Sequence, residues 1–204
     1  MPGCAVNDGG PLAAVERVSR DLKLRGKRFA LVGGLAVTAR SEPRFTRDVD
    51  LCVVVESDEE AERLVFDMRA EGYDVVATVE HGDVHRLSTV RLRNPDGIVC
   101  DLLLASSGVE AEVVARATEI PLTENVTLPV AIVEDLLALK VLSATHLRPQ
   151  DLLDVRALVD FNPNFKRELV LETLRLVETR GYHRGQNLEQ KLEEMLNLVL
   201  STRS

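Results

Sequence analysis

The chain has 204 residues, a formal net charge of −8 at pH 7, and 45% hydrophobic residues. That hydrophobic fraction is ordinary for a globular protein and excludes general disorder. The acidic balance disfavours broad, non-specific nucleic-acid binding, which needs Lys and Arg facing phosphates, but it allows a local basic cleft. Three cysteines are too few for a disulfide framework, and no apolar run reaches the ~18–20 residues of a membrane helix. Because the N-terminal residues also lack the pattern of a secretory signal, we expect a cytoplasmic protein without a membrane span.

The first half of the chain alternates helical and strand-like patterns. Apolar residues at helical spacing predict a helix over residues 11–25, followed by a short buried strand over 28–34 and a short helix over 35–42. A Val-rich strand over 48–55 comes next. The helix predicted over 57–72 begins with a capping serine and a run of acids, and it ends at a glycine.

Three strand-like runs follow, over residues 73–80, 84–93 and 98–105. The turn signal Asn-Pro-Asp-Gly at residues 94–97 predicts that the last two runs form an antiparallel hairpin. Residues 109–118 have a helical pattern, and residues 120–132 are irregular or strand-like.

The pattern becomes almost entirely helical beyond residue 130. Four helices are predicted, over residues 133–146, 149–160, 164–181 and 187–201. We therefore expect a small domain of strands and helices over residues 1–130 and a C-terminal helical domain over residues 131–204.

Asp48 and Asp50 open an otherwise apolar strand. Residues i and i+2 of a strand point to the same face, roughly 6.5–7 Å apart, so the two carboxylates repel each other unless a cation lies between them. Carboxylate oxygens suit Mg²⁺, and paired metals stabilise the attacking and leaving oxygens in nucleotidyl transfer. The alternative is that both aspartates face water at the start of the strand.

Two neighbouring features favour the metal interpretation. Gly33 and Gly34 end the preceding strand and begin a short helix, where glycines let a phosphate approach the backbone N–H groups. Asp101 lies within an apolar strand, where an unpaired carboxylate is costly to bury. The three acids converge if the two strands are neighbours. Because side chains alternate between the two faces of a strand, Cys52 then lies on the face of Asp50, and Cys100 lies on the face opposite Asp101. The two thiols therefore cannot pair.

The Gly-Gly pair, the Asp-x-Asp and the later acid together resemble the nucleotidyltransferase superfamily, whose fold is that of the polymerase-β palm. Arg44-x-Thr46-x-Asp48-x-Asp50 is similar, more narrowly, to the Arg-x-Ser/Thr-x-Asp-x-Asp motif of AbiEii-type toxin nucleotidyltransferases. The resemblance implies an α+β fold, with a mixed β-sheet flanked by helices and then a C-terminal helical bundle.

A second block, residues 133–155, resembles a later motif of that family, with a lysine, an arginine-bearing turn and Gln-Asp-x-x-Asp. In this chain those residues are Lys140, Arg148, Asp151 and Asp154. The resemblance implies that Lys140 and Asp151 help to bind and position the nucleotide. Lys140→Met is then expected to reduce turnover while leaving the melting temperature nearly unchanged. The alternatives are a solvated surface lysine and an Asp151 that only stabilises a helix N-terminus.

The resemblance assigns catalytic roles to five residues: Asp48, Asp50, Asp101, Lys140 and Asp151. Metal binding, by two Mg²⁺ ions, would fall to Asp48, Asp50 and Asp101. Nucleotide binding would fall to Gly33, Gly34, Arg44, Thr46 and Lys140. Arg44 could instead only balance the aspartates, and Thr46 could cap the strand.

The resemblance implies an enzyme that transfers an NMP group from an NTP to an acceptor hydroxyl, with Asp101 as the base. The acceptor would be a tRNA 3′ end or a protein hydroxyl, and the protein would be the toxin of a type IV-like pair with a cognate antitoxin. A nucleotidyltransferase acting on a small molecule such as an antibiotic, and a catalytically inactive nucleotide-binding module, are the alternatives.

Overall fold

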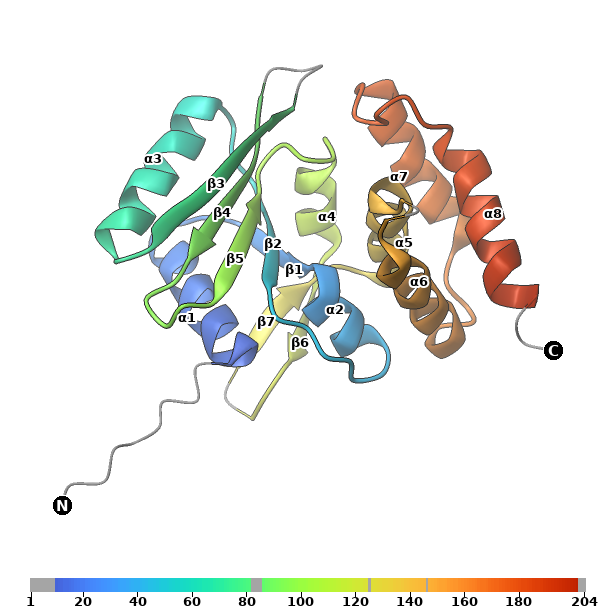
Figure 1. The fold of residues 1–204 in the computed structure, drawn as a ribbon, viewed down its shortest axis with the longest axis horizontal. Helices are drawn as coiled ribbons and strands as arrows, with labels where there is room; N and C mark the ends of the chain where they lie inside the picture. Colours follow the sequence, from blue (N-terminus) through green and yellow to red (C-terminus); the bar gives the residue numbers. More distant parts are fainter. Residues whose placement is uncertain (1–9, 82–85, 125, 146, 202–204) are drawn as a thin grey trace.

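The computed structural model describes residues 10–81, 86–124, 126–145 and 147–201. Within them, seven strands form one mixed sheet in the order β3-β4-β5-β2-β1-β7-β6 (Figure 1). The strands are β1 (Phe29–Val32), β2 (Val49–Val53), β3 (Asp74–His81), β4 (Arg86–Arg93), β5 (Val99–Leu103), β6 (Thr118–Pro121) and β7 (Thr127–Val130).

The centre of the sheet brings together segments that are far apart in the chain. β2 pairs antiparallel with β1 and parallel with β5. β5 pairs antiparallel with β4, so the hairpin predicted around residues 94–97 is confirmed. The sequence left residues 120–132 as irregular or strand-like; in the structure β6 and β7 pair antiparallel at the sheet edge, and Thr118, predicted to end a helix, begins β6.

Eight helices accompany the sheet in the described part of the chain. They are α1 (Pro11–Leu24), α2 (Gly33–Arg40), α3 (Asp58–Ala70), α4 (Glu110–Arg116), α5 (Val133–Ser143), α6 (Pro149–Phe161), α7 (Arg167–Thr179) and α8 (Leu188–Ser201). The cap predicted for α3 is confirmed, because the Ser57 side chain accepts a hydrogen bond from the backbone N–H of Glu60. None of the described helices combines the length and apolarity of a membrane span.

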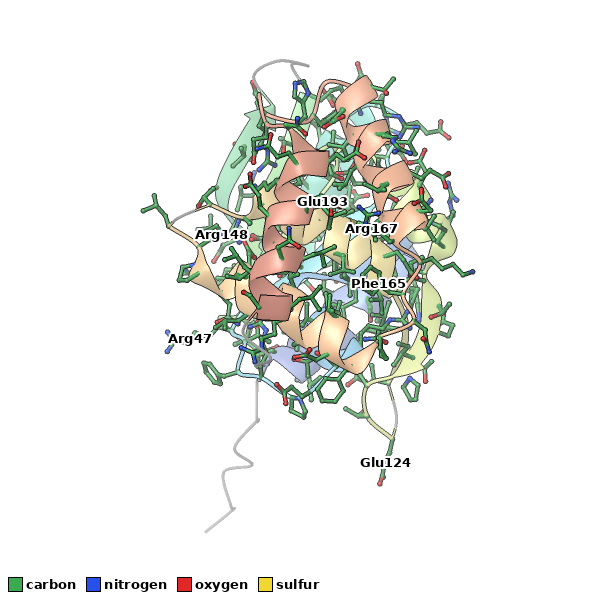
Figure 2. The ribbon with its side chains drawn as sticks, turned by 90° about the vertical axis from the view of Figure 1, so that its right-hand side faces the viewer. Arg47, Glu124, Arg148, Phe165, Arg167 and Glu193 are labelled. Atoms are coloured by element: carbon green, nitrogen blue, oxygen red, sulfur yellow. The ribbon has the colours of Figure 1, made fainter. Side chains whose placement is uncertain are left out.

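The helices divide between the two faces of the sheet. α1 and α3 cover one face, whereas α4 and the C-terminal helices α5–α8 lie on the other (Figure 1). α7 and α8 form the outer layer and are joined by an ion pair between Arg167 and Glu193 (Figure 2). One hydrophobic cluster runs from strand residues such as Leu51 to Leu136 of α5 and Leu192 of α8.

The α+β class, the mixed sheet and the four C-terminal helices are confirmed, while several boundaries differ from the prediction. Gly33 and Gly34 begin α2, as predicted, but they are not part of β1, which ends at Val32. The domain boundary near residue 130 stays a prediction.

Candidate active site

Asp50 and Asp101 are direct neighbours on the two central strands β2 and β5. Their Cα atoms are in register in the parallel pairing, so both side chains point to the same face of the sheet. This is the face covered by α4 and α5, since Cys52, two residues after Asp50, is influenced electrostatically by Glu110 and Asp135 of those helices. Cys100 lies in register with Val49 on the opposite face, as predicted, and both cysteines are buried and free.

The pKa of Asp50 is raised to about 6. Burial is the largest cause, followed by repulsion from Asp101; Asp48 adds repulsion, while Lys140 and a backbone hydrogen bond from Gly34 lower the pKa. Asp48 itself is half-buried and immediately precedes β2. The other two predicted acids therefore both repel the negative charge of Asp50.

Arg91, which the sequence interpretation missed, pairs with the third acid. It lies opposite Asp101 in the β4–β5 hairpin, and its guanidinium donates two hydrogen bonds, of 2.8 and 2.7 Å, to the two Asp101 oxygens. Counting outward from the turn at residues 94–97 pairs position 91 with position 100, so the sequence signal is one residue off and only the structure sets this register.

The two glycines make room for the motif side chains. Gly33 has a left-handed backbone with φ of 62°, and a Cβ placed on it would lie 1.9 Å from Asp50 Oδ2. A Cβ on Gly34 would lie 2.6 Å from the Arg44 guanidinium and 2.7 Å from Thr46 Oγ1. The N-terminus of α2 can therefore approach Asp50, Arg44 and Thr46 only because neither residue carries a side chain.

The second motif forms a buried ionic network between α5 and α6. Lys140 Nζ lies 2.9 Å from Asp151 Oδ1 and 2.7 Å from Asp154 Oδ2, and both aspartates are buried. The Lys140 side chain is only 11% exposed, so it is not a solvated surface lysine. Arg44 donates a 2.9 Å hydrogen bond to Asp154, which joins the first motif to the second.

The two motifs border a common cavity of about 290 Å³ between the sheet and the C-terminal helices. Asp50, Asp101, Arg91 and Gly33 line it from the sheet side, and Lys140 lines it from α5. Asp151 and Asp154 lie behind Lys140 and are not among its lining residues. The cavity thus combines carboxylates, which can bind a divalent cation, with positively charged side chains and a helix N-terminus, which can bind a polyphosphate.

A family model described as "Nucleotidyl transferase AbiEii toxin, Type IV TA system" matches residues 18–201. The chain belongs to the AbiEii nucleotidyltransferase family. The family assignment made from the two motifs is thereby confirmed, and the protein is a nucleotidyltransferase. A comparison with curated proteins finds no match.

Several solved structures are similar to this AbiEii-family chain. An antigenic nucleotidyltransferase-like protein from Paracoccidioides brasiliensis is 18% identical, with a TM-score of 0.52 over 91% of this chain and 93% of that one. The lincosamide antibiotic adenylyltransferase LnuA in its lincomycin-bound form is 13% identical, with a TM-score of 0.49 over 73% and 96% of the two chains. The antibiotic-resistance factor ANT(2'')-Ia is 18% identical, with a TM-score of 0.48 over 94% and 92%.

The acids of this AbiEii-family chain fit Mg²⁺ by their chemistry. Asp48, Asp50 and Asp101 supply hard oxygen ligands, and the repulsion that raises the pKa of Asp50 is the kind that a divalent cation relieves. Among the described residues, no three Asp, Glu, His or Cys side chains are already arranged as a metal site. The Arg91–Asp101 pair gives a physical reason, because the guanidinium occupies both oxygens of the third acid.

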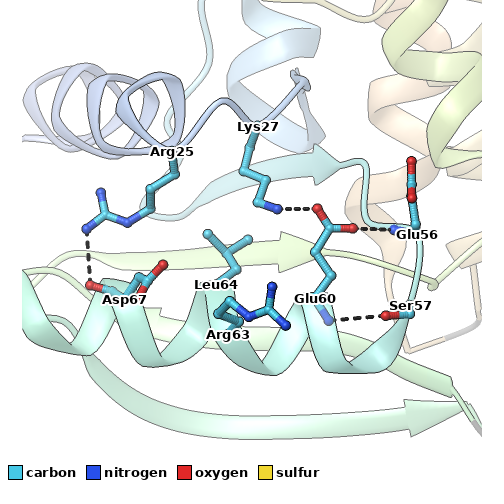
Figure 3. Close-up of a pocket in the computed structure, with 8 residues that line it drawn as sticks. All are labelled: Arg25, Lys27, Glu56, Ser57, Glu60, Arg63, Leu64 and Asp67. Carbon is cyan, nitrogen blue, oxygen red and sulfur yellow. Dashed lines mark hydrogen bonds and ion pairs between the residues drawn. The ribbon is translucent and has the colours of Figure 1, made fainter.

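A second hollow, of about 420 Å³, lies between α1 and α3 on the opposite face (Figure 3). Two of its cations, Arg25 and Lys27, are already engaged by the protein. Lys27 pairs with Glu60, and Arg25 donates to the Asp67 carbonyl and to Glu71. It contains neither of the family motifs, so we do not assign it to the active site.

Proposed function

We propose that this AbiEii-family protein transfers an NMP group from an NTP to an acceptor hydroxyl in a Mg²⁺-dependent reaction. The observation that carries the proposal is the register of Asp50 with Asp101 on the wall of a cavity that also receives the N-terminus of α2. Two adjacent carboxylates without a shared cation destabilise the fold, so a catalytic use explains them better than a structural one.

In this reaction, the acceptor oxygen forms a bond to the α-phosphorus of the NTP, and the bond from that phosphorus to the α–β bridging oxygen breaks. Pyrophosphate leaves, and the proton of the acceptor hydroxyl passes to a carboxylate, for which Asp101 is our assignment. Asp48, Asp50 and Asp101 would hold Mg²⁺, which lowers the barrier by neutralising charge on the reacting phosphate.

The remaining predicted residues would position the nucleotide. Gly33 and Gly34 offer backbone N–H groups at the start of α2, with Arg44 and Thr46 packed against them. Lys140 borders the cavity and would place a positive charge near the phosphates, while Asp151 orients Lys140 through their 2.9 Å ion pair.

We further propose that the acceptor is a tRNA 3′ end or a protein hydroxyl, and that the protein is the toxin of a toxin–antitoxin pair with a protein antitoxin. Membership of the AbiEii family supports this biological role.

The direct test is to incubate the protein with each NTP labelled at the α-phosphate, Mg²⁺ and bulk tRNA. Asp48→Asn and Asp50→Asn should abolish transfer, whereas Asp74→Asn, which changes an exposed acid on β3, should not. Label in tRNA or in protein supports the proposed acceptors, and label only after addition of a small molecule selects that acceptor instead. NTP binding without any transfer in the wild-type protein would refute the proposed activity.

A further inference from the structure

Arg184, in the loop between α7 and α8, has an unfavourable backbone conformation. Among the described residues it is the non-glycine residue with a positive φ, at 55°. The nearby Gly181 and Gly185 also have positive φ values, of 82° and 69°, as expected in such a loop. Strain of this kind persists where a side chain is needed, and it is an observation from which a function can be inferred.

The Arg184 side chain reaches the cavity of the active site. It lines this cavity together with Arg148, Asp50 and Asp101. Its hydrogen bond in the structure is a long one, 3.3 Å, to the backbone carbonyl of Ser106. No described Asp or Glu forms an ion pair with Arg184, so its charge is not compensated by the protein.

Other cations around the cavity are engaged with acids. Arg91 pairs with Asp101, and Lys140 pairs with two aspartates. Arg148, whose side chain is 60% exposed, lies at 3.4 Å from Asp151 and stands beside α8 (Figure 2).

Helix α8 adds a further cation that donates to no described acid. Lys191 of α8 donates to the carbonyl of Ala144 and to the side-chain oxygen of Gln186, and not to an acid. Desolvation and the positive charge of Arg148 lower the pKa of Arg184, and Arg184 in turn contributes to the lowered pKa of Lys191. Arg148, Arg184 and Lys191 therefore form a cluster of three cations beside one acid, Asp151, in a protein of net charge −8.

We propose that Arg184, supported by Arg148, binds the triphosphate of the incoming NTP on the helical side of the cavity. The NTP identity of the ligand rests on the proposed function. A guanidinium offers two parallel N–H donors to phosphate oxygens and stays charged when desolvated. A triphosphate is favoured over the phosphates of a polynucleotide acceptor because the cavity of about 290 Å³ is small and is shared with the Asp50–Asp101 pair.

The test is a calorimetric titration of the full-length protein with inorganic tripolyphosphate in the presence of EDTA. Without metal ions the acidic residues cannot bind the anion, so the titration measures binding by the cationic residues alone. Arg184→Gly is the informative variant, because glycine adopts a φ of 55° without strain and should leave the melting temperature equal or higher. The matched control is Arg175→Gln, which removes an exposed arginine of α7 that pairs with Glu189.

We expect Arg184→Gly to weaken tripolyphosphate binding by ~10-fold or more, as for the loss of other charge-assisted hydrogen bonds, and Arg175→Gln to change it by less than about 2-fold. An Arg184→Gly affinity within about 2-fold of wild type overturns the proposal. A parallel titration with single-stranded RNA distinguishes the two phosphate sources, because an effect on RNA binding alone would assign Arg184 to the acceptor and would also overturn it.

Failure of this inference and failure of the proposed activity give different results. If label transfer occurs but tripolyphosphate binding does not depend on Arg184, only the role of Arg184 is wrong. If binding depends on Arg184 but no NTP supports transfer, the anion site stands and the proposed activity is wrong.

Discussion

Asp50 lies directly beside Asp101 across the parallel pairing of β2 and β5. The negative charges of the two carboxylates are offset by different neighbouring groups. Asp101 receives two hydrogen bonds from Arg91, whereas Asp50 is stabilised by electrostatic attraction to Lys140 and, less strongly, by a backbone hydrogen bond from Gly34. The ionised form of Asp50 is therefore destabilised in the folded protein.

Asp50→Asn should stabilise the metal-free protein at pH 8. The pKa of Asp50 is raised from 3.8 to about 6, so the Asp50 carboxyl binds its proton more tightly in the native state than in the unfolded state. The contribution of Asp50 to stability is thus fully present below about pH 4 and is lost as the pH rises through about 6. We expect a gain of about 1–2 kcal/mol at pH 8, discounted for partial exposure, and almost none at pH 4.

Urea denaturation in EDTA at the two pH values measures this effect. Adding Mg²⁺ should reverse the order, because the cation stabilises the ionised wild-type site more than the amide. A variant that is less stable than wild type at pH 8 would show that Asp50 has a favourable structural partner.

Gly33→Ala should abolish transfer, whereas Gly26→Ala should leave it intact. Both glycines have left-handed backbones, with φ of 62° and 66°, so each alanine costs roughly 1–2 kcal/mol of strain. Only at Gly33 does the new Cβ meet another group, at 1.9 Å from Asp50 Oδ2, while at Gly26 nothing lies within 4 Å. Thermal melting and the label-transfer assay together separate strain from displacement of Asp50. Equal activities of the two variants would contradict the assignment.

Arg91→Gln should tighten Mg²⁺ binding. The guanidinium holds both oxygens of Asp101, so a metal ion that uses this carboxylate must displace it. Because the Arg91 side chain is 47% exposed, its loss should cost less than about 1 kcal/mol of stability. Isothermal titration with Mg²⁺ should show affinity increased several-fold, and Arg93→Gln on the same strand is the control. Weaker Mg²⁺ binding would mean instead that Arg91 positions Asp101 for the metal.

Lys140→Met should destabilise the protein, which revises the expectation drawn from the sequence. Its ammonium group lies between Asp151 and Asp154, both buried, so removing it leaves two acids with less compensation. We expect a loss of about 3 kcal/mol, since breaking a buried ion pair is strongly destabilising. Lys23→Met, on the exposed side of α1, should change stability by less than about 0.5 kcal/mol.

The double variant Lys140→Met/Asp154→Asn separates the two roles of Lys140. Removing one of the two acids that faced Lys140 should recover part of the lost stability but none of the lost transfer if Lys140 also contacts the nucleotide. Recovery of both would show that Lys140 acts only through the structure.

The sequence by itself determined the family, the order of most elements and the face on which the acids lie. These properties are local: period two places Asp48 and Asp50 together, Ser57 begins a helix, and the turn at residues 94–97 makes a hairpin. The motif spacing around Arg44 and Asp151 was enough to identify the AbiEii family because it is a short-range pattern.

The tertiary structure decided which charges are already paired. Arg44 reaches Asp154 across 110 residues, and Arg184 reaches the cavity from a loop that carries no recognisable motif. The close approach of Asp50, Arg44 and Thr46, a further reason for the Gly33–Gly34 pair, also could not be predicted from the sequence. Ion pairing and close approach depend on distances between segments that are far apart in the chain, and these distances are set only when the sheet and the helices pack together.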